Sequence, residues 1–240
     1  TNLNIEPIKN DYGSQLRSST YYGGDFYIQN GGNILRYNDS SDLLSIELQE
    51  TINSGWDNAG ANTQGDGIQF DVGHNIIAVA NAHARQGSTN KGYFYVLEKN
   101  NSGNWIKSNT IEVGHQAHGV KIDPTTPYTV YVSGEGPSGG DGFVAAFHSE
   151  GIGEGSQWSQ GFFSSDPDSY EFYKLDITTD VQILVTGRTG SGGYSARYDK
   201  FGNQIDRLID DNSSEAKASI DHSTSSYGTG FIRKVDGQWI

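Results

Sequence analysis

The sequence predicts an all-β protein built from repeated four-stranded units, and three observations support this prediction. The 240 residues include 32 Gly, 14 Tyr and 10 Phe, a composition typical of short strands joined by tight turns. The hydrophobic fraction of 34% is low for one large core and suits several small cores better. The third observation is an alternating strand ending in Asp that recurs along the chain.

This recurring strand is identified by its final Asp. It occurs as GIQFD, GVKID, FYKLD and KASID, which end at Asp71, Asp123, Asp176 and Asp221. The intervals between these Asp residues are 52, 53 and 45 residues, a period in the range of propeller blades. Since an Asp at a strand end accepts hydrogen bonds from the backbone of the following turn, we interpret these residues first as markers of the fold.

Each of the first three units continues with the remaining strands of a blade. The second strands IIAVAN, TVYVSG and QILVTG lead into glycine-rich loops, and the third strands GYFYVLEK, GFVAAFHS and GYSARYDK follow. A turn and a fourth strand complete each unit, and a meander of four strands is the pattern of a β-propeller blade. A β-sandwich would not by itself explain an Asp at near-constant spacing.

Two sequence echoes extend the repeat toward both ends of the chain. GNWI at 103–106 matches GQWI at 237–240, and ILRYNDSSDLL at 34–44 matches SARYDKFGNQI at 195–205. A last blade formed from both chain ends would close the ring and leave no open sheet edge. We therefore expect a single propeller domain over 1–240 with five blades, at 11–55, 56–113, 114–166, 167–211 and 212–240 plus 1–10.

Composition and missing motifs exclude several classes of function. The formal net charge of −13, with only 16 Lys and Arg, argues against nucleic-acid binding. The absence of cysteine excludes disulfides and thiolate metal sites. No apolar run approaches the roughly 18 residues of a membrane span, and the sequence has no P-loop, G-x-S-x-G, H-E-x-x-H or complete EF-hand motif.

Two stretches resemble known propeller repeats. HGVKIDPTTPYTVYVSGEG at 118–136 resembles the repeat of YVTN and lactonase-like propellers, in which His-Gly opens a strand, Asp-Pro ends it and a Tyr-Val strand follows. Residues 65–105 resemble FG-GAP-like repeats without their Asp-rich calcium loop. The resemblance covers about two blades and implies that the first strand of each blade lines a central channel. It also implies that the loop between the second and third strands lies at the channel mouth.

Under that arrangement, polar residues at fixed distances from the marker Asp residues would gather at the channel mouth. Asp66, His118 and Glu171 stand five positions before a marker, as does Ala216, and His83, Glu135, Arg188 and Arg233 stand twelve positions after one. His115 lies just outside this ring.

These residues have three interpretations. Asp66, His118 and Glu171 would suit a divalent cation such as calcium, manganese or zinc, since these ions accept oxygen and imidazole ligands. Alternatively His118, Glu171 and Glu135 would supply an acid and a base, with Arg188 holding an anionic group of a substrate. In the structural interpretation, His118 simply bonds to a neighbouring blade, because buried polar groups need partners.

The tryptophans divide into two groups. Trp105, Trp158 and Trp239 follow the third strand at comparable positions, so we expect them to pack between blades, with repeated sugar-stacking platforms as the alternative. Trp56 lies outside that register and is expected to be exposed. Candidate ligand contacts are therefore Trp56, His83, Arg85, His115 and Arg188.

We rank first a non-enzymatic recognition module that binds a glycan or other surface ligand in an extracellular, cell-surface or virion setting. Repeated blades present similar sites, which converts weak binding into avidity. The alternative is a metal-assisted hydrolase or lyase at the channel mouth. A second alternative is a structural virion component that docks to other protein chains. Apart from a divalent cation, no cofactor is expected.

Overall fold

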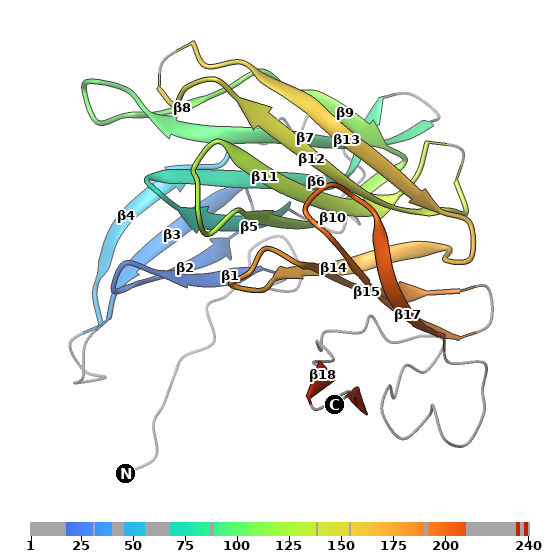
Figure 1. The fold of residues 1–240 in the computed structure, drawn as a ribbon. Helices are drawn as coiled ribbons and strands as arrows, with labels where there is room; N and C mark the ends of the chain where they lie inside the picture. Colours follow the sequence, from blue (N-terminus) through green and yellow to red (C-terminus); the bar gives the residue numbers. More distant parts are fainter. Residues whose placement is uncertain are drawn as a thin grey trace, which may run out of the picture.

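Four antiparallel sheets follow one another along the chain and are arranged as the blades of a propeller (Figure 1). This confirms the predicted all-β fold with four-stranded antiparallel blades. No helix occurs in the part of the chain that the structure describes, so none there is long and apolar enough to cross a membrane. The computed structural model describes residues 18–30, 32–39, 46–55, 68–86, 89–137, 139–153, 155–189, 192–209, 234–235 and 238–239.

The first two sheets, blades A and B, are both meanders. Blade A consists of β1 (Ser19–Tyr22), β2 (Asp25–Asn30), β3 (Asn33–Asn38) and β4 (Leu48–Asn53). Blade B consists of β5 (Ile68–Gly73), β6 (Ile76–Gln86), β7 (Thr89–Lys99), β8 (Trp105–Lys107) and β9 (Ile111–Gly114). Because β8 and β9 both pair with β7, the fourth strand of blade B is split in two.

Blades C and D repeat the meander. Blade C consists of β10 (Gln116–Ile122), β11 (Thr129–Glu135), β12 (Gly142–Ser149) and β13 (Trp158–Asp166). Blade D consists of β14 (Glu171–Ile177), β15 (Ile183–Arg188), β16 (Gly193–Tyr198) and β17 (Gln204–Ile209). The strands of the four sheets fall in the ranges expected for the first four blades, except that β9 ends at Gly114, one residue past the expected boundary at 113.

A short hairpin follows near the C-terminus, formed by β18 (Lys234–Val235) and β19 (Gln238–Trp239). It pairs Lys234 with Trp239, as the turn between β7 and β8 pairs Lys99 with Trp105. In both hairpins the tryptophan of the sequence echo thus pairs with a lysine of the preceding strand. The other residues expected in a fifth blade lie outside the described residues, so the blade count and the ring closure stay predictions.

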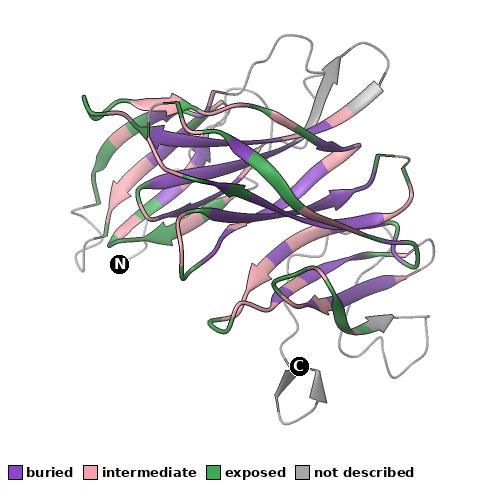
Figure 2. Cartoon of the chain, turned by 45° about the horizontal axis from the view of Figure 1, so that its top comes forward, coloured by how far each residue is buried: buried purple, intermediate pink, exposed green. Residues whose placement is uncertain are grey.

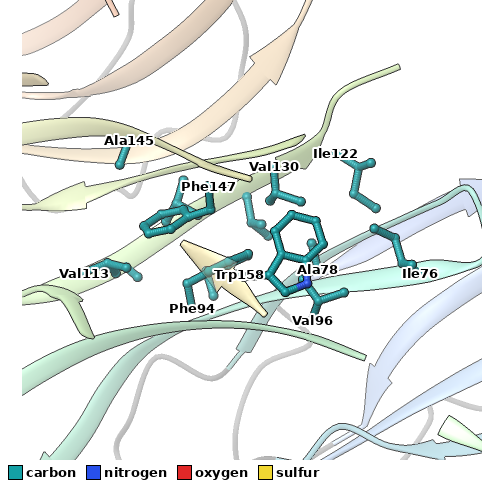
Figure 3. Packing of buried hydrophobic residues seen from close by; sticks show 14 of the residues in the cluster. Ile76, Ala78, Phe94, Val96, Val113, Ile122, Val130, Ala145, Phe147 and Trp158 are labelled. Carbon is teal, nitrogen blue, oxygen red and sulfur yellow. The ribbon is translucent and has the colours of Figure 1, made fainter. Parts of the chain in front are cut away.

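The hydrophobic core is divided into three clusters, one between each pair of successive blades. Successive residues of a strand point to opposite faces of a sheet. In β6, Ile76 and Ala78 therefore join the cluster with blade C, while Ile77 joins the cluster with blade A. Figure 3 shows the cluster between blades B and C, where Phe94 stacks on Phe147 with ring centroids 4.5 Å apart.

This division explains why a low hydrophobic fraction is sufficient. Blades B and C are buried on both faces and form the buried centre of the molecule in Figure 2. The exposed residues lie on turns, on the outer blades A and D and along part of β13, as Figure 2 also shows. Several thin cores between sheets replace one large core, as the composition predicted.

The first strands of the blades lie at the centre of the arrangement, where β5 and β14 both contact β10 (Figure 1). Lys174 of blade D reaches past β10 and donates to the Gln69 side chain of blade B over 3.1 Å. Lys121 of β10 lies 3.2 Å from the Asp71 carboxylate and 3.9 Å from that of Asp176. The first strands of blades B and D, with blade C between them, are thus close enough for one lysine side chain to join them. The first strands therefore converge.

The marker Asp residues have structural roles. Asp123 accepts the backbone N–H of Thr125 over 2.7 Å and so caps the turn that follows, as expected. Asp71 instead joins three blades, because it accepts the N–H of Ile122 over 3.0 Å and the hydroxyl of Thr20 over 3.2 Å. Asp221 lies outside the described residues.

Candidate functional site

Two β-bulges shape the first strands of blades C and D at the same end. The bulge in β10 lies between Ala117 and Gly119, and the bulge in β14 lies between Phe172 and Lys174. The extra residue of a bulge leaves the regular alternation and its side chain takes a new direction. Here those residues are His118 and Tyr173.

A glycine stands opposite each bulge on the second strand of the blade. A Cβ atom added to Gly134 would lie 1.9 Å from the carbonyl oxygen of Gln116, and one added to Gly187 would lie 1.9 Å from that of Glu171. Both distances are far inside van der Waals contact, so only glycine fits. Gly134 in the SGEG stretch and Gly187 in the TGRT stretch are thus required for the bulged backbone.

The register of the strands corrects one step of the sequence comparison. Gln116 pairs with Glu135 in blade C, and Glu171 pairs with Arg188 in blade D. Glu171 is therefore equivalent to Gln116, and the equivalent of His118 is Tyr173, whereas alignment on the marker Asp residues had matched His118 with Glu171.

The error arises because the marker Asp residues of the two blades are not at equivalent positions: Asp176 stands two positions before Thr178, the structural counterpart of Asp123. Asp123 bonds to the carbonyl of Thr129, whereas its structural counterpart Thr178 bonds to that of Gln182. The turn in blade C is therefore two residues longer. Counting twelve positions forward from each marker Asp nevertheless matched Glu135 correctly with Arg188. The marker of blade D stands two positions earlier in its strand, and its turn is two residues shorter, so the two differences cancel.

His118, Glu171 and Arg188 form one contact chain across the boundary of blades C and D. Nε2 of His118 contacts Oε1 of Glu171, and Nη2 of Arg188 lies 3.3 Å from Oε2 of the same carboxylate. The side chains of His118 and Glu171 are 8% and 5% exposed, while that of Arg188 is 47% exposed. The chain thus runs from the interior to the surface.

The neighbour of His118 lets the two blades approach this closely. A Cβ atom at Gly119 would lie 2.8 Å from Cβ and 2.9 Å from the backbone nitrogen of Leu175 in β14. The His-Gly pair therefore combines a buried imidazole directed at Glu171 of blade D with a position where only glycine lets β14 pass.

The donors around Glu171 favour its charged form. Burial alone would raise the pKa of this carboxyl, but His118, Tyr173 and Arg188 together hold its pKa below the usual value. A carboxylate buried with several donors remains ionised, and it fixes the orientation of the groups that bind it.

A second histidine–carboxylate pair lies within blade C. Nδ1 of His115, between β9 and β10, is 2.7 Å from Oε2 of Glu135 at the end of β11. The other oxygen of Glu135 accepts the N–H of Gly140 over 3.2 Å. The His115 side chain is 32% exposed and that of Glu135 is 4% exposed, so a buried carboxylate orients a partly exposed imidazole.

Two tyrosines complete the rim, and the sequence comparison missed both. The guanidinium carbon of Arg188 lies 4.5 Å from the ring centroid of Tyr170 and 5.9 Å from that of Tyr173. The Tyr170 ring also borders Gly140, where an added Cβ would lie 3.8 Å from it. Tyr170 thereby lies between Arg188 and Gly140, whose N–H bonds to Glu135. The signal in the sequence was the pair of tyrosines flanking Glu171 in SYEFY.

We call the surface formed by His115, Glu135, Tyr170, Tyr173 and Arg188, with the His118–Glu171 pair beneath it, the rim. It contains five of the predicted site residues: His115, His118, Glu135, Glu171 and Arg188. Of the others, Trp56 and Asp66 lie outside the described residues, as do Ala216 and Arg233. His83 and Arg85 lie in β6, where the structure describes the backbone but not their side chains.

The predicted metal site is not assembled within the described residues. Among them, no group of three or more His, Asp or Glu side chains is placed to hold a metal ion. His118 and Glu171 contact each other, and Asp66 is the member of the predicted set that the structure leaves undescribed. A divalent cation at the channel mouth therefore stays a prediction.

Two of the three tryptophans expected to pack between blades do so, Trp105 and Trp158, while the structure describes only the backbone of Trp239. Nε1 of Trp105 donates to Glu50 of blade A over 2.9 Å, and Nε1 of Trp158 donates to Glu98 of blade B over 2.9 Å. Each indole thus bonds to the preceding blade. Trp158 is only 2% exposed, which leaves no face for stacking on a sugar.

Comparison with known structures supports the fold. The chain is similar to a candidate 6-phosphogluconolactonase from Bacteroides uniformis, with a TM-score of 0.57 and 12% identity over 81% of this chain and 55% of the other. It is also similar to Sqt1 of Saccharomyces cerevisiae, with a TM-score of 0.50 and 11% identity over 83% of this chain and 48% of that one.

A functionally unknown protein from Desulfotomaculum acetoxidans is similar to the same degree, with a TM-score of 0.50 and 10% identity over 81% of this chain and 56% of the other. The chain thus spans about half the length of these structures. No protein family and no curated protein matches the sequence. At such low identity the likeness concerns the fold alone, which is that of a β-propeller.

Proposed function

We propose that this protein is a recognition module that binds a glycan or a related surface ligand at the rim. The observation that carries the proposal is the state of Arg188, whose guanidinium is half exposed yet fixed between the ring of Tyr170 and the buried Glu171. An arginine held in this way loses little conformational freedom when it binds a ligand. Beside it, Tyr170 offers an aromatic surface that is 39% exposed, and such surfaces suit the flat faces of sugars.

The burial of His118 favours recognition over chemistry at that residue. Its side chain is 8% exposed and its Nε2 is already bonded to Glu171. A general base must come within hydrogen-bond reach of the proton that it removes. His118 in this position supports Glu171, and through it Arg188, rather than contacting a ligand.

The proposal is tested by binding to a panel of immobilised glycans. We expect Tyr170→Ala and Arg188→Gln to abolish binding to any glycan that the unmodified protein retains. Tyr128→Ala is the matched control, because this tyrosine is 46% exposed and lies in the turn at the opposite end of blade C. Binding that survives both rim substitutions, or no binding to any glycan, would contradict the proposal.

A hydrolase or lyase is the second candidate, and one observation favours it. His115 is partly exposed and its Nδ1 is fixed by the buried Glu135, which leaves Nε2 as the nitrogen without a partner among the described residues. A histidine oriented through Nδ1 by a carboxylate is the arrangement of many general bases.

This second candidate is tested by turnover of lactone, ester and acidic polysaccharide substrates, with and without added calcium, manganese or zinc. Activity lost in His115→Ala and retained in Tyr128→Ala would establish it. The absence of turnover from all of these substrates, together with rim-dependent glycan binding, would leave recognition as the function.

A further inference from the structure

The rim presents hydrogen-bond donors to solvent and keeps its carboxylates bonded inward. Both oxygens of Glu171 are engaged, one by His118 and the other by Arg188. Both oxygens of Glu135 are engaged as well, one by His115 and the other by the N–H of Gly140. With side chains only 5% and 4% exposed, neither carboxylate is free to accept a bond from a ligand.

The exposed part of the rim has the opposite character. A guanidinium carries five N–H donors, and within the described residues the Arg188 side chain makes one ion pair, with Glu171 at 3.3 Å. The guanidinium carbon lies 4.5 Å from the ring centroid of Tyr170 and 5.9 Å from that of Tyr173, and 47% of the side chain stays exposed. Arg188 thus offers a rigid fork of donors that matches two oxygens in one plane.

A neutral sugar would need a different surface. Sugar hydroxyls donate as well as accept hydrogen bonds, so a site for neutral sugars needs acceptors that face the ligand. At the rim both carboxylates are bonded inward, and the side-chain acceptors that remain are Nε2 of His115 and the tyrosine hydroxyls, fewer than the donors of Arg188. A ligand group that only accepts hydrogen bonds fits the exposed donors better.

We propose that the ligand of the rim is an acidic saccharide whose carboxylate binds the edge of the Arg188 guanidinium. This inference rests on the proposed recognition function and specifies its ligand class. Paired arginine–carboxylate hydrogen bonds are short and strong, and they discriminate by geometry. The net charge of −13 would repel polyanions from the protein as a whole, so an acidic ligand is held only where a local donor group offsets that repulsion.

The experiment compares each acid with its own neutral derivative. The probes are oligosaccharides of galacturonate, glucuronate and mannuronate, together with sialyllactose, each measured by calorimetry beside its methyl ester. The ester keeps the ring hydroxyls and removes the charge. We expect at least one acid to bind tenfold or more tightly than its ester, and we expect this preference to weaken as salt is raised.

Two substitutions assign the preference to the rim. Arg188→Gln should abolish the difference between acid and ester, while Arg188→Lys should retain part of it, since lysine keeps the charge and loses the planar fork. Arg207→Gln is the matched control, because this arginine of β17 is 42% exposed and, like Arg188, pairs with one carboxylate, that of Asp168. It should leave both affinities unchanged.

The outcomes separate this inference from the proposed function. Equal, Arg188-dependent binding of acid and ester would overturn the carboxylate inference and leave glycan recognition in place. A preference for acids that survives Arg188→Gln would place their carboxylate elsewhere and would also overturn the inference. Failure of the whole panel, neutral glycans included, would overturn both proposals.

Discussion

Blades C and D have the same backbone arrangement around their bulges and differ in the side chains that they place at the rim. Both have a bulge at the start of the first strand and a glycine opposite it, at Gly134 and Gly187. At the equivalent positions around the bulge, Gln116, His118 and Glu135 of blade C correspond to Glu171, Tyr173 and Arg188 of blade D. What is repeated belongs to the scaffold, and what is not repeated is the better guide to function.

The differences are also complementary. Blade C carries its rim carboxylate on the second strand at Glu135, while blade D carries its carboxylate on the first strand at Glu171. Each carboxylate binds a histidine of blade C, but the Glu135 contact lies within one blade and the Glu171 contact joins two blades. The second pair therefore fixes the position of blade D relative to blade C.

The largest effect is expected when the repeated scaffold is broken. Gly134→Ala or Gly187→Ala would place a Cβ atom 1.9 Å from a backbone carbonyl oxygen, so the bulge must be lost or displaced. We expect a loss of roughly 3 kcal/mol or more in the free energy of unfolding, measured by urea denaturation. Gly151→Ala is the control, because nothing lies within 4 Å of its added Cβ. Equal stability of all three variants would contradict the role given to these glycines.

The next largest effect should separate the two carboxylates. Glu171→Ala leaves His118 without a partner in the interior and also frees Arg188, so it should cost about 3 kcal/mol. Glu135→Ala should cost less, about 1 to 2 kcal/mol, since the partly exposed His115 can bond to water instead. Glu112→Ala, at a 52% exposed carboxylate paired with Lys91, is the control and should change stability by about 0.5 kcal/mol or less. Equal costs at Glu171 and Glu135 would remove the distinction between the two pairs.

The pH dependence of stability sharpens the same comparison. The folded-state pKa of Glu171 is below its ordinary value of 4.5, so in acid the unfolded chain binds more protons at this group than the folded chain does. Its contribution to stability is therefore fully present above about pH 4.5 and is lost as pH falls through the lower folded-state pKa. We expect Glu171→Gln to be less stable than the unmodified protein at pH 7. Between about pH 5 and about pH 2, the range in which carboxyl groups titrate, it should lose less stability than the unmodified protein does, as measured by urea denaturation. An unchanged acid dependence in this variant would mean that the charge of Glu171 contributes nothing to folding.

The blade architecture could be predicted from the sequence because the repeated segments are apolar strands that pack on both faces. Ile76 and Ile77, adjacent in β6, are both fully buried, and this is what continuous apolar strands such as IIAVAN require. The convergence of the first strands was implied by the resemblance to known propeller repeats, and the bond from Lys174 to Gln69 agrees with it. The strand pattern itself is local and recurs from unit to unit.

The pairing at the rim depended on details that spacing does not contain. Asp176 stands two positions before the structural counterpart of Asp123, and the longer turn after Asp123 conceals this shift, so residues that share a position were misidentified in the first strand. The contribution of Tyr170 was missed because it precedes a strand and acts through the face of its ring on Arg188. A period gives the order of residues around an axis, whereas contacts depend on the one or two residues that a bulge or turn inserts.

The smallest effect on stability is expected at Arg188, and it decides whether this residue belongs to the scaffold or to the site. The Arg188 side chain is 47% exposed and makes one ion pair, of 3.3 Å, with Glu171, so Arg188→Gln should change the free energy of unfolding by less than about 1 kcal/mol. The same substitution should abolish ligand binding at the rim, while Arg207→Gln should affect neither property. An Arg188→Gln protein as unstable as Glu171→Ala would instead make Arg188 a structural partner of the buried carboxylate. A small change in stability with a complete loss of binding is expected only if the position that is not repeated between blades C and D serves recognition.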